Sequence, residues 1–285
     1  MILYDSRDKN YLKMQILNDI PERKYIEAET FLAFLGIYED KKRERGYKKG
    51  LKRLKDYIKG KTCIEAGAGF GIFSEYLVKL GAKKVYAIES NRLAFNVLKE
   101  NVAKYEQIIP IRSRIENFKP REEISLLIHD FFGNLLYDES LFALENLKFK
   151  PKRVFPNRAK LRYAVVNANK YYDDCITKNV IKQLSGMLIS DLFLELKDSW
   201  QGTALEWQYP DGLKKYQIKL PYENLEDLLL VFGLQIYDDD LKIAEAGKDS
   251  NWSLVWTPVD ANIFNLDFKI DKNHGYVKVK IEWTN

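Results

Sequence analysis

Apolar and polar positions change period several times along this chain of 285 residues, and each change predicts a new element of secondary structure. In the first half, short apolar runs predict strands, and helical periods predict the helices between them. The expected strands are residues 62–66, 84–88, 108–112 and 124–128, with helices at 72–80 and 92–104. Alternating segments of these lengths are typical of a mostly parallel sheet that helices cover on both faces.

Two further helices are expected ahead of this alternating region. Asp19 is followed by Pro21 and, three residues after Asp19, by Glu22. An acid at the N-cap with a glutamate three positions later is a helix start, and proline is tolerated in the first turn. This helix should run to about Leu35, and a second should occupy about residues 46–58.

After Phe155 the helical period fades and short, aromatic-rich segments with alternating polarity follow. They lie at residues 161–166, 207–220, 228–237, 253–257, 263–270 and 276–283. This pattern predicts an antiparallel β domain that opens near Pro156. The domains expected are therefore 1–155, an α/β domain with N-terminal helices, and 156–285, a β-barrel-like domain. Residues 173–200 are expected to form a largely helical excursion from the second domain.

The first expected strand runs directly into a glycine-rich turn. Gly67, Gly69 and Gly71 allow a tight turn and a close approach of a ligand to the backbone. Such turns occur in NAD, FAD and S-adenosylmethionine (SAM) enzymes, so the turn alone does not name the cofactor. Glu89 ends the next strand, where an acid can accept hydrogen bonds from ribose hydroxyls. A solvated loop carboxylate is the alternative.

Residues 124–141 carry the second candidate site. A strand delivers Asp130 to the carboxyl edge of the sheet, and a turn around Gly133 brings Glu139 back toward it. Two carboxylates on one hairpin form a suitable clamp for a guanidinium, whose planar donors prefer bidentate carboxylates. Plain surface acids are the alternative on spacing alone.

Several motifs in order resemble those of the protein arginine N-methyltransferases. E-A-G-A-G-F-G at 65–71 resembles the family's SAM-binding motif I, and residues 85–89 its next strand with the ribose-binding acid. Residues 113–116 (S-R-I-E) match the segment that places a glutamate on the adenine. Residues 129–140 match the double-glutamate loop, P-N-R-A at 156–159 the start of the β-barrel domain, and S-N-W at 250–252 its Thr-His-Trp loop. Tyr4, Asp5, Ser6 and Asp19 keep the spacing of the family's first helices.

The resemblance implies a SAM-dependent transfer of a methyl group to a guanidino nitrogen of an arginine in a protein, a peptide or a small molecule, with S-adenosylhomocysteine as product. The guanidinium-binding positions are Asp130 and Glu139. His129 either accepts a proton or is a structural residue at the strand end. The implied cofactor residues are Arg23, Glu65, Gly67, Gly69, Gly71, Glu89, Arg114, Ile115 and Glu116, and the implied substrate residues are Asn251 and Trp252.

Some positions depart from the family's pattern. Asp130 is one methylene shorter than the family's glutamate, Asn251 replaces a histidine, and Phe131 with Phe132 replaces Trp-Met. Arg23 matches the family's SAM-carboxylate arginine only with a shift of one residue. The segment 173–200 is the candidate for the family's helical dimerisation arm, so a homodimer is expected.

Composition bears on metal sites, disulfides, membrane contact and the distribution of charge. Two cysteines and two histidines supply neither a disulfide framework nor a Cys/His zinc site, so no metal is expected. No apolar run approaches the ~20 residues that span a bilayer, and a cytoplasmic protein without membrane contact is expected. The run from Lys41 to Lys61 holds eleven Lys or Arg, whereas residues 222–249 are acidic.

The basic run supports an alternative, an RNA methyltransferase in which the run follows a phosphate backbone. It ranks second because Asp130 and Glu139 would repel a phosphate-bearing substrate. A SAM-binding protein without catalysis, suggested by the altered Asp130 and Asn251, ranks third.

Overall fold

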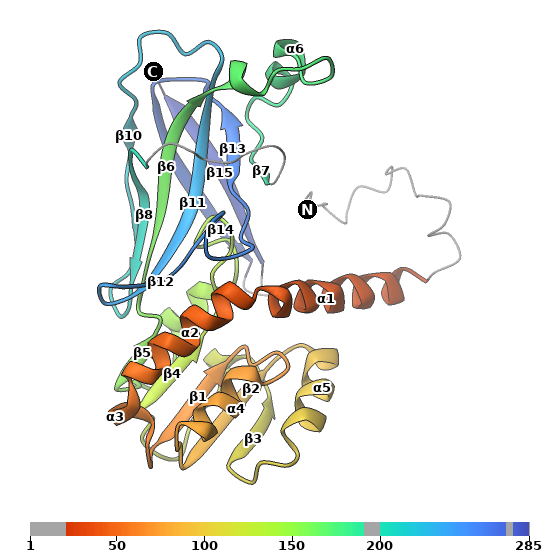
Figure 1. Cartoon of the computed structure of the whole chain (residues 1–285), viewed down its shortest axis with the longest axis vertical. Coiled ribbons are helices and arrows are strands. Elements are labelled where there is room, and N and C mark those ends of the chain that lie inside the picture. The colour runs from red at the N-terminus through yellow and green to blue at the C-terminus, as the bar shows by residue number, and fades with distance from the viewer. Residues whose placement is uncertain (1–20, 191–199, 272–275, 285) are drawn as a thin grey trace.

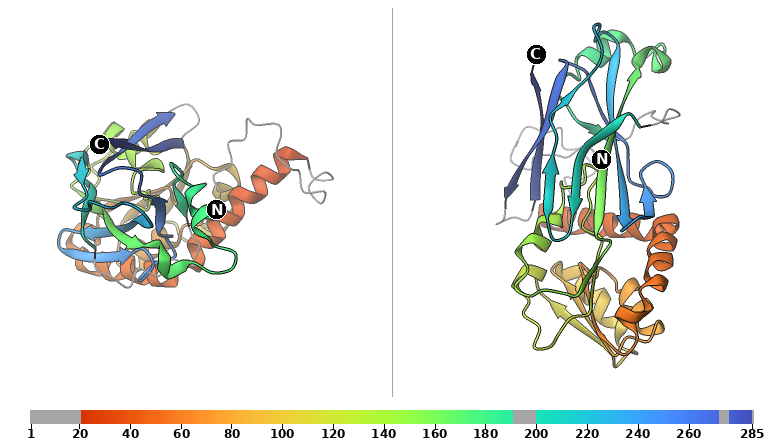
Figure 2. Two further views of the ribbon diagram at one scale, coloured as in Figure 1. Left: turned by 90° about the horizontal axis from the view of Figure 1, so that it is seen from above. Right: turned by 90° about the vertical axis from the view of Figure 1, so that its left-hand side faces the viewer.

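The structure is a computed structural model that describes residues 21–190, 200–271 and 276–284. An α/β domain and an elongated β domain are stacked on each other, and two N-terminal helices run between them (Figure 1). The view from the side shows the same two layers with the helices at their junction (Figure 2).

The α/β domain is built on a parallel sheet of five strands in the order β3-β2-β1-β4-β5. Its strands are β1 (Thr62–Ala66), β2 (Lys84–Glu89), β3 (Ile108–Arg112), β4 (Leu126–His129) and β5 (Arg153–Phe155). The helices are α4 (Ile72–Lys79) and α5 (Arg92–Val102), with 3-10 turns η2 (Ile115–Asn117) and η3 (Ser140–Asn146). The alternating pattern of the sequence is therefore confirmed, with β5 as a short strand that the pattern did not predict.

The N-terminal helices are α1 (Glu22–Glu39), α2 (Lys41–Arg53) and α3 (Lys55–Ile58). Asp40 caps α2, because its side chain accepts a hydrogen bond from the backbone N–H of Arg43 at 3.0 Å. The expected start of this helix near residue 46 was therefore too late. Helix α1 continues past Leu35, and the proposed N-cap Asp19 lies outside the described residues, as do Tyr4, Asp5 and Ser6.

The β domain contains a seven-stranded sheet, in which β12 pairs only with β11, and a three-stranded sheet, in the orders β7-β13-β11-β6-β8-β9 and β10-β14-β15. All their pairings are antiparallel, as the alternating pattern predicted. The strands are β6 (Arg158–Asn167), β7 (Ile189–Ser190), β8 (Gly202–Gln208), β9 (Gly212–Lys215), β10 (Ile218–Lys219), β11 (Leu228–Asp238), β12 (Leu241–Glu245), β13 (Val255–Pro258), β14 (Ile263–Asp271) and β15 (Tyr276–Thr284).

The segment expected to form a helical arm is mostly not helical where the structure describes it. After the 3-10 turn η4 (Ala168–Tyr171), only α6 (Lys178–Lys182) is an α-helix, and β7 follows. Gly186 adopts φ +76°, a left-handed conformation that ends helical continuation. The expectation of a largely helical segment is wrong for residues 173–190, and residues 191–199 lie outside the described part. Helix α6 lies at the end of the β domain away from the α/β domain (Figure 1).

Helix α2 joins the two domains. Its buried side chains include Tyr47 and Leu51, and Gly50 is so close to Phe155 that an added Cβ would lie 2.5 Å from that ring. Gly46 lies directly against the backbone of Ile243 in β12. This packing holds the carboxyl edge of the parallel sheet against α2 and the β domain. Among the helices described, none is long and apolar enough to cross a membrane.

Candidate active site

The glycine turn between β1 and α4 needs its glycines for backbone conformation. Gly67, Gly69 and Gly71 have φ of +67°, +53° and +90°, which side chains with a Cβ rarely adopt. Glu89, at the end of β2, accepts from the backbone N–H groups of Gly69 (2.8 Å) and Asn91 (2.7 Å). Burial raises the pKa of Glu89, although these hydrogen bonds oppose the rise. Glu89 therefore holds the glycine turn in place through the Gly69 N–H.

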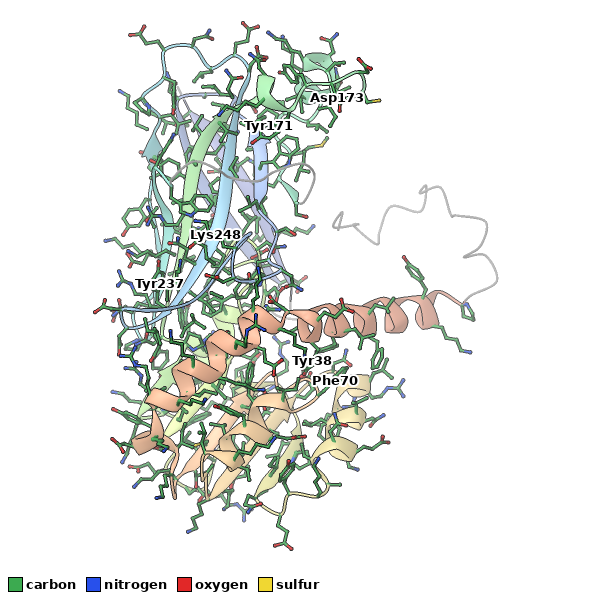
Figure 3. The ribbon with its side chains drawn as sticks, in the orientation of Figure 1. Tyr38, Phe70, Tyr171, Asp173, Tyr237 and Lys248 are labelled. Carbon is green, nitrogen blue, oxygen red and sulfur yellow. The ribbon has the colours of Figure 1, made fainter. Side chains whose placement is uncertain are left out.

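Helix α1 covers the glycine turn with aromatic side chains. The Tyr38 hydroxyl accepts a hydrogen bond from the Phe70 backbone N–H, and the two rings stack at 4.6 Å. Figure 3 shows this pair where α1 passes over the turn. Phe31 and Phe34 contact the same ring, at 5.6 and 5.7 Å. A pocket of about 60 Å³ remains between this aromatic cover, the glycine turn and Asp130.

Asp130 follows β4 at the same edge and is held by two donors. The Tyr47 hydroxyl donates to one carboxylate oxygen at 2.7 Å, and Arg43 Nη1 lies 3.3 Å from the other. Burial raises the pKa of Asp130, whereas Arg43 and the Tyr47 hydrogen bond act against this rise. Both donors come from α2, so this helix fixes the direction of the carboxylate.

Arg43 is itself enclosed. Its guanidinium lies 3.2 Å from Asp40 and 4.4 Å from the centre of the Trp252 ring. Asn251 joins the same group, because its backbone N–H donates to Asp40 at 2.7 Å. The structure thus brings Asn251 and Trp252 to the candidate site, as the sequence predicted. The loop of the β domain that carries them closes over the start of α2.

Sequence reasoning missed Asp40, Arg43 and Tyr47. They lie at positions i, i+3 and i+7 and so share one face of α2. This spacing could have indicated a buried polar face. The many lysines around it instead favoured the interpretation of a solvated helix. Arg23, proposed instead, lies in the first turn of α1, and nothing is described of its side chain.

Glu139 returns to the site at the end of the loop that Gly133 opens. Gly133 leaves room for Asp138, since an added Cβ would lie 2.2 Å from its carboxylate. Glu139 is open to solvent, and among the described residues it has no hydrogen bond or ion pair. The protein around its carboxyl group and the charges of Asp138 and Asp130 raise the pKa of Glu139, and Arg43 opposes the rise. Glu139 is therefore the carboxylate left free for a cation.

His129 has a structural environment. Its Nε2 lies 2.9 Å from the Pro156 carbonyl, and the Phe131 backbone N–H points to its Nδ1 at 3.4 Å. Burial lowers the pKa of His129 to about 4, so the ring is neutral and donates from Nε2. Both nitrogens are thus engaged by the backbone, which favours the structural alternative over the catalytic one.

A second pocket, of about 220 Å³, lies beyond β3. It is lined by Arg114, Glu116, Asn117, Phe142 and Asn146. Arg114 Nε lies 2.7 Å from Glu116, while Ile115 is buried beneath them at 3% exposure. Of the three neighbouring residues proposed for the cofactor, two therefore line a pocket and the third packs in the core. Glu65 is also buried, and it accepts from the Ser74 backbone N–H at 2.6 Å.

These residues match the chemical groups of SAM. The glycine turn admits a close ligand, and Glu116 in η2 lines the second pocket with a carboxylate. Glu89 ends β2 beside the turn, with its oxygens bonded to the Gly69 and Asn91 N–H groups. Arg43 is a cation at this edge of the sheet, and Asp40 and Asp130 already pair with it, so it would bind an amino-acid carboxylate only by giving up one of these pairs. The Tyr38–Phe70 contact leaves little room at the turn, so α1 must shift when a ligand of this size binds.

The fold is a Rossmann-like α/β domain joined to an antiparallel, barrel-like β domain. No model of a protein family matches the chain. Solved structures do: Arabidopsis thaliana protein arginine methyltransferase 10 superposes with a TM-score of 0.59 at 16% identity, over 88% of this chain and 93% of that one. A structure of PRMT6 with SAH gives a TM-score of 0.61 at 14% identity, over 89% and 99%.

Curated sequences agree with this fold. Protein arginine N-methyltransferase 6 of Xenopus tropicalis is 32% identical over 160 residues, 51% of this chain and 47% of that protein. Its namesake from Danio rerio is 29% identical over 172 residues, 57% and 46% of the two chains. The chain thus spans less than half of these relatives. The comparisons relate it to the protein arginine N-methyltransferase family, as the motifs indicated.

Tyr47→Phe tests whether the Tyr47 hydrogen bond controls the pKa of Asp130. Loss of the hydroxyl removes a bond that favours the ionised carboxylate, so the pKa of Asp130 should rise further. If catalysis needs the carboxylate, the acid limb of the pH–rate profile should move to higher pH, and unfolding should cost about 1 kcal/mol less. Tyr76→Phe, which removes a hydroxyl 3.5 Å from the Lys48 carbonyl, is the control. Equal profiles for the two variants would contradict the assigned role.

Proposed function

We propose that the protein transfers a methyl group from SAM to a guanidino nitrogen of arginine. The observation that carries this proposal is the pair of carboxylates beside the glycine turn. Asp130 is held in place by Tyr47 and Arg43, and Glu139 is unpaired among the described residues. One fixed and one free carboxylate are a suitable recognition set for a guanidinium.

The cofactor would be held by the glycine turn, Glu89, Glu116 and Arg43. When bound, SAM supplies a methyl group on a sulfonium and leaves as S-adenosylhomocysteine. Asp130 and Glu139 hold the guanidinium and draw its positive charge toward the nitrogens they contact. The remaining nitrogen keeps lone-pair density for the new C–N bond. The proton that this nitrogen then loses passes to a carboxylate or to water, so His129 is not needed.

The acceptor is proposed to be an arginine of a protein or peptide. The relatives are named protein arginine N-methyltransferases, which supports this class of acceptor over a free guanidino compound. An RNA acceptor fits less well, because phosphate groups would meet Asp130 and Glu139. The SAM-binding protein without catalysis keeps the same pocket and differs only in turnover.

The deciding experiment incubates the full chain with labelled SAM and a mixture of arginine-rich proteins and peptides. Label in methylarginine after acid hydrolysis supports the proposal. Loss of the label on nuclease treatment would show that RNA is the methyl acceptor. Binding of SAM without label in any acceptor would leave the non-catalytic alternative.

Glu89→Ala tests the cofactor site. It removes a carboxylate that both holds the Gly69 N–H and is proposed to bind the cofactor, so SAM affinity should fall by about 1 to 3 kcal/mol. Isothermal calorimetry with SAM and with S-adenosylhomocysteine measures the change. Glu100→Ala, an exposed acid of α5, should bind both ligands normally. Heat with NAD and none with SAM would reject the cofactor assignment.

A homodimer is also proposed. Part of the candidate arm, residues 173–190, is described, and it exposes Val180 and Met187 at 45% and 54%. Helix α1 exposes Leu32 and Ile37 at 62% and 44%. Apolar groups on both segments support contact between copies, which would close as a pair.

A further inference from the structure

The basic run forms a surface that the proposed active site does not use. Helix α2 buries Arg43, Tyr47 and Leu51 on one side, and its lysines and Arg45 lie on the opposite side. The exposed cations on this side and on the adjoining segments are Arg45, Lys49, Lys52, Lys55, Lys59, Lys61 and Lys83. We name these seven residues the basic surface.

The cations of the basic surface form no ion pairs within the described residues, and Asp56 is an exposed acid in the same run. Among the described residues, none of the seven forms a salt bridge, whereas neighbouring Lys41 and Lys48 are both paired with Glu44. Arg53 belongs to a different group, because it interacts with Asp238 and Asp239 of the β domain. The described ion pairs of α2 therefore leave these seven cations without an ion-pair partner, and Asp56 is the exposed acid that lies among them.

Tertiary structure extends the surface beyond a single helix. The Lys83 backbone N–H donates to the Lys61 carbonyl at 2.9 Å, and Lys59 bridges Ala82. The segment before β2 thus adds Lys83 to the end of the run. Helix α2 has 13 residues and is about 20 Å long at 1.5 Å per residue, and α3 follows it. This length suits several consecutive phosphates rather than a single anion.

One aromatic side chain is exposed within the run. Tyr57, in α3, is 38% exposed and lies between Lys55 and Lys59 in sequence. Cations that follow a backbone, combined with an exposed aromatic ring, are the means by which proteins bind single strands, since unpaired bases stack on such rings. An acidic polypeptide would use the cations but would have no use for the ring.

We propose that the basic surface binds single-stranded nucleic acid, independently of the methyl-acceptor site. The strand would lie on the outer side of α2, whereas Arg43 and Tyr47 face the acceptor site from its inner side. The nucleic acid is then a bound partner and not the acceptor. This role accounts for the basic run without the repulsion from Asp130 and Glu139 that an RNA acceptor would meet.

The test measures binding of a fluorescein-labelled 20-nucleotide oligo-U to the full chain by anisotropy between about 50 and 300 mM salt. Over this range each phosphate contact should lose affinity by about 3.5-fold. Lys49→Gln, Lys52→Gln and Lys55→Gln together should weaken binding roughly 100-fold at about 0.1 M salt and reduce the slope of log K against log salt by roughly 2. Lys269→Gln, Lys278→Gln and Lys280→Gln, three exposed lysines of β14 and β15, remove the same charge and should have little effect.

Tyr57→Ala separates the partner classes. It should weaken oligo-U binding several-fold without changing the salt slope, because stacking carries no counterion release. Three results would each overturn the proposal. The first is absence of oligo-U binding, and the second is an equal loss of binding in both triple variants. The third is polyglutamate binding as tight as that of oligo-U, with no effect of Tyr57→Ala. No methyl transfer is measured, so failure of the proposed enzyme activity would leave this test intact.

Discussion

Glu139→Gln is expected to lower methyl transfer by about 100-fold or more while SAM affinity stays nearly unchanged. The substitution keeps the shape of the side chain and removes the negative charge that is free for a cation. A preorganised charged partner of the reacting group typically contributes a factor of ~10² or more in rate. The cofactor contacts lie on the glycine turn and at the ends of β2 and β3, so binding of SAM should survive.

The measurement compares kcat and acceptor KM for the variant with calorimetric SAM affinity. Glu123→Gln is the matched control, since Glu123 is 70% exposed and, within the described part of the chain, pairs with Lys152 alone. Normal turnover in Glu139→Gln would remove the basis of the arginine assignment. Because surrounding protein and nearby acids raise the pKa of Glu139, wild-type kcat/KM should increase with pH well above the ordinary glutamate range.

Arg43→Met is expected to lower the free energy of unfolding by about 3 kcal/mol. Arg43 and Asp40 expose only 6% and 3% of their side chains, and Asp130 exposes 17%. Removing the guanidinium leaves two poorly solvated carboxylates without their cation, and breaking a buried pair in this way costs about 3–5 kcal/mol. Arg43 opposes the rise in the pKa of Asp130, so without it this carboxyl would be easier to protonate, and the loss should be larger at neutral pH than at pH 5.

Denaturant titration of Arg43→Met and Arg45→Met checks this expectation. Arg45 is exposed on the opposite side of the same helix, and its loss should change stability by less than about 0.5 kcal/mol. Adding Asp130→Asn to Arg43→Met should recover part of the lost stability, since one unpaired charge is removed. Equal midpoints for the two arginine variants would show that the Arg43 ion pairs contribute nothing net.

The sequence predicted the elements that depend on local pattern. Alternating short strands and helices around the glycine turn, the antiparallel second half, and Asp130 and Glu139 at one edge were all readable, because strand period and glycine conformation act within a few residues. Asn251 and Trp252 came from the resemblance, and the structure places them over α2.

The prediction of a helical arm was wrong because local sequence does not report long-range strand pairing. A helical composition in residues 173–190 was interrupted by the left-handed conformation of Gly186 and by pairing of β7 with β13. The pairing partner lies more than sixty residues away in sequence, and no local period reports such a contact.

The inner face of α2 was decided by tertiary structure. In sequence, Arg43 and Tyr47 belong to the basic run that Asp40 precedes, and a solvated helix was the simplest interpretation. Only the packing of α2 between the parallel sheet and the β domain turns these three inward, where Arg43 meets Asp130 and Trp252. By itself the sequence determined which groups could do chemistry along its strands and turns, because those groups are fixed by neighbouring residues. Which side of a charged helix becomes the active site depends on burial against distant segments, and that was decided only by the fold.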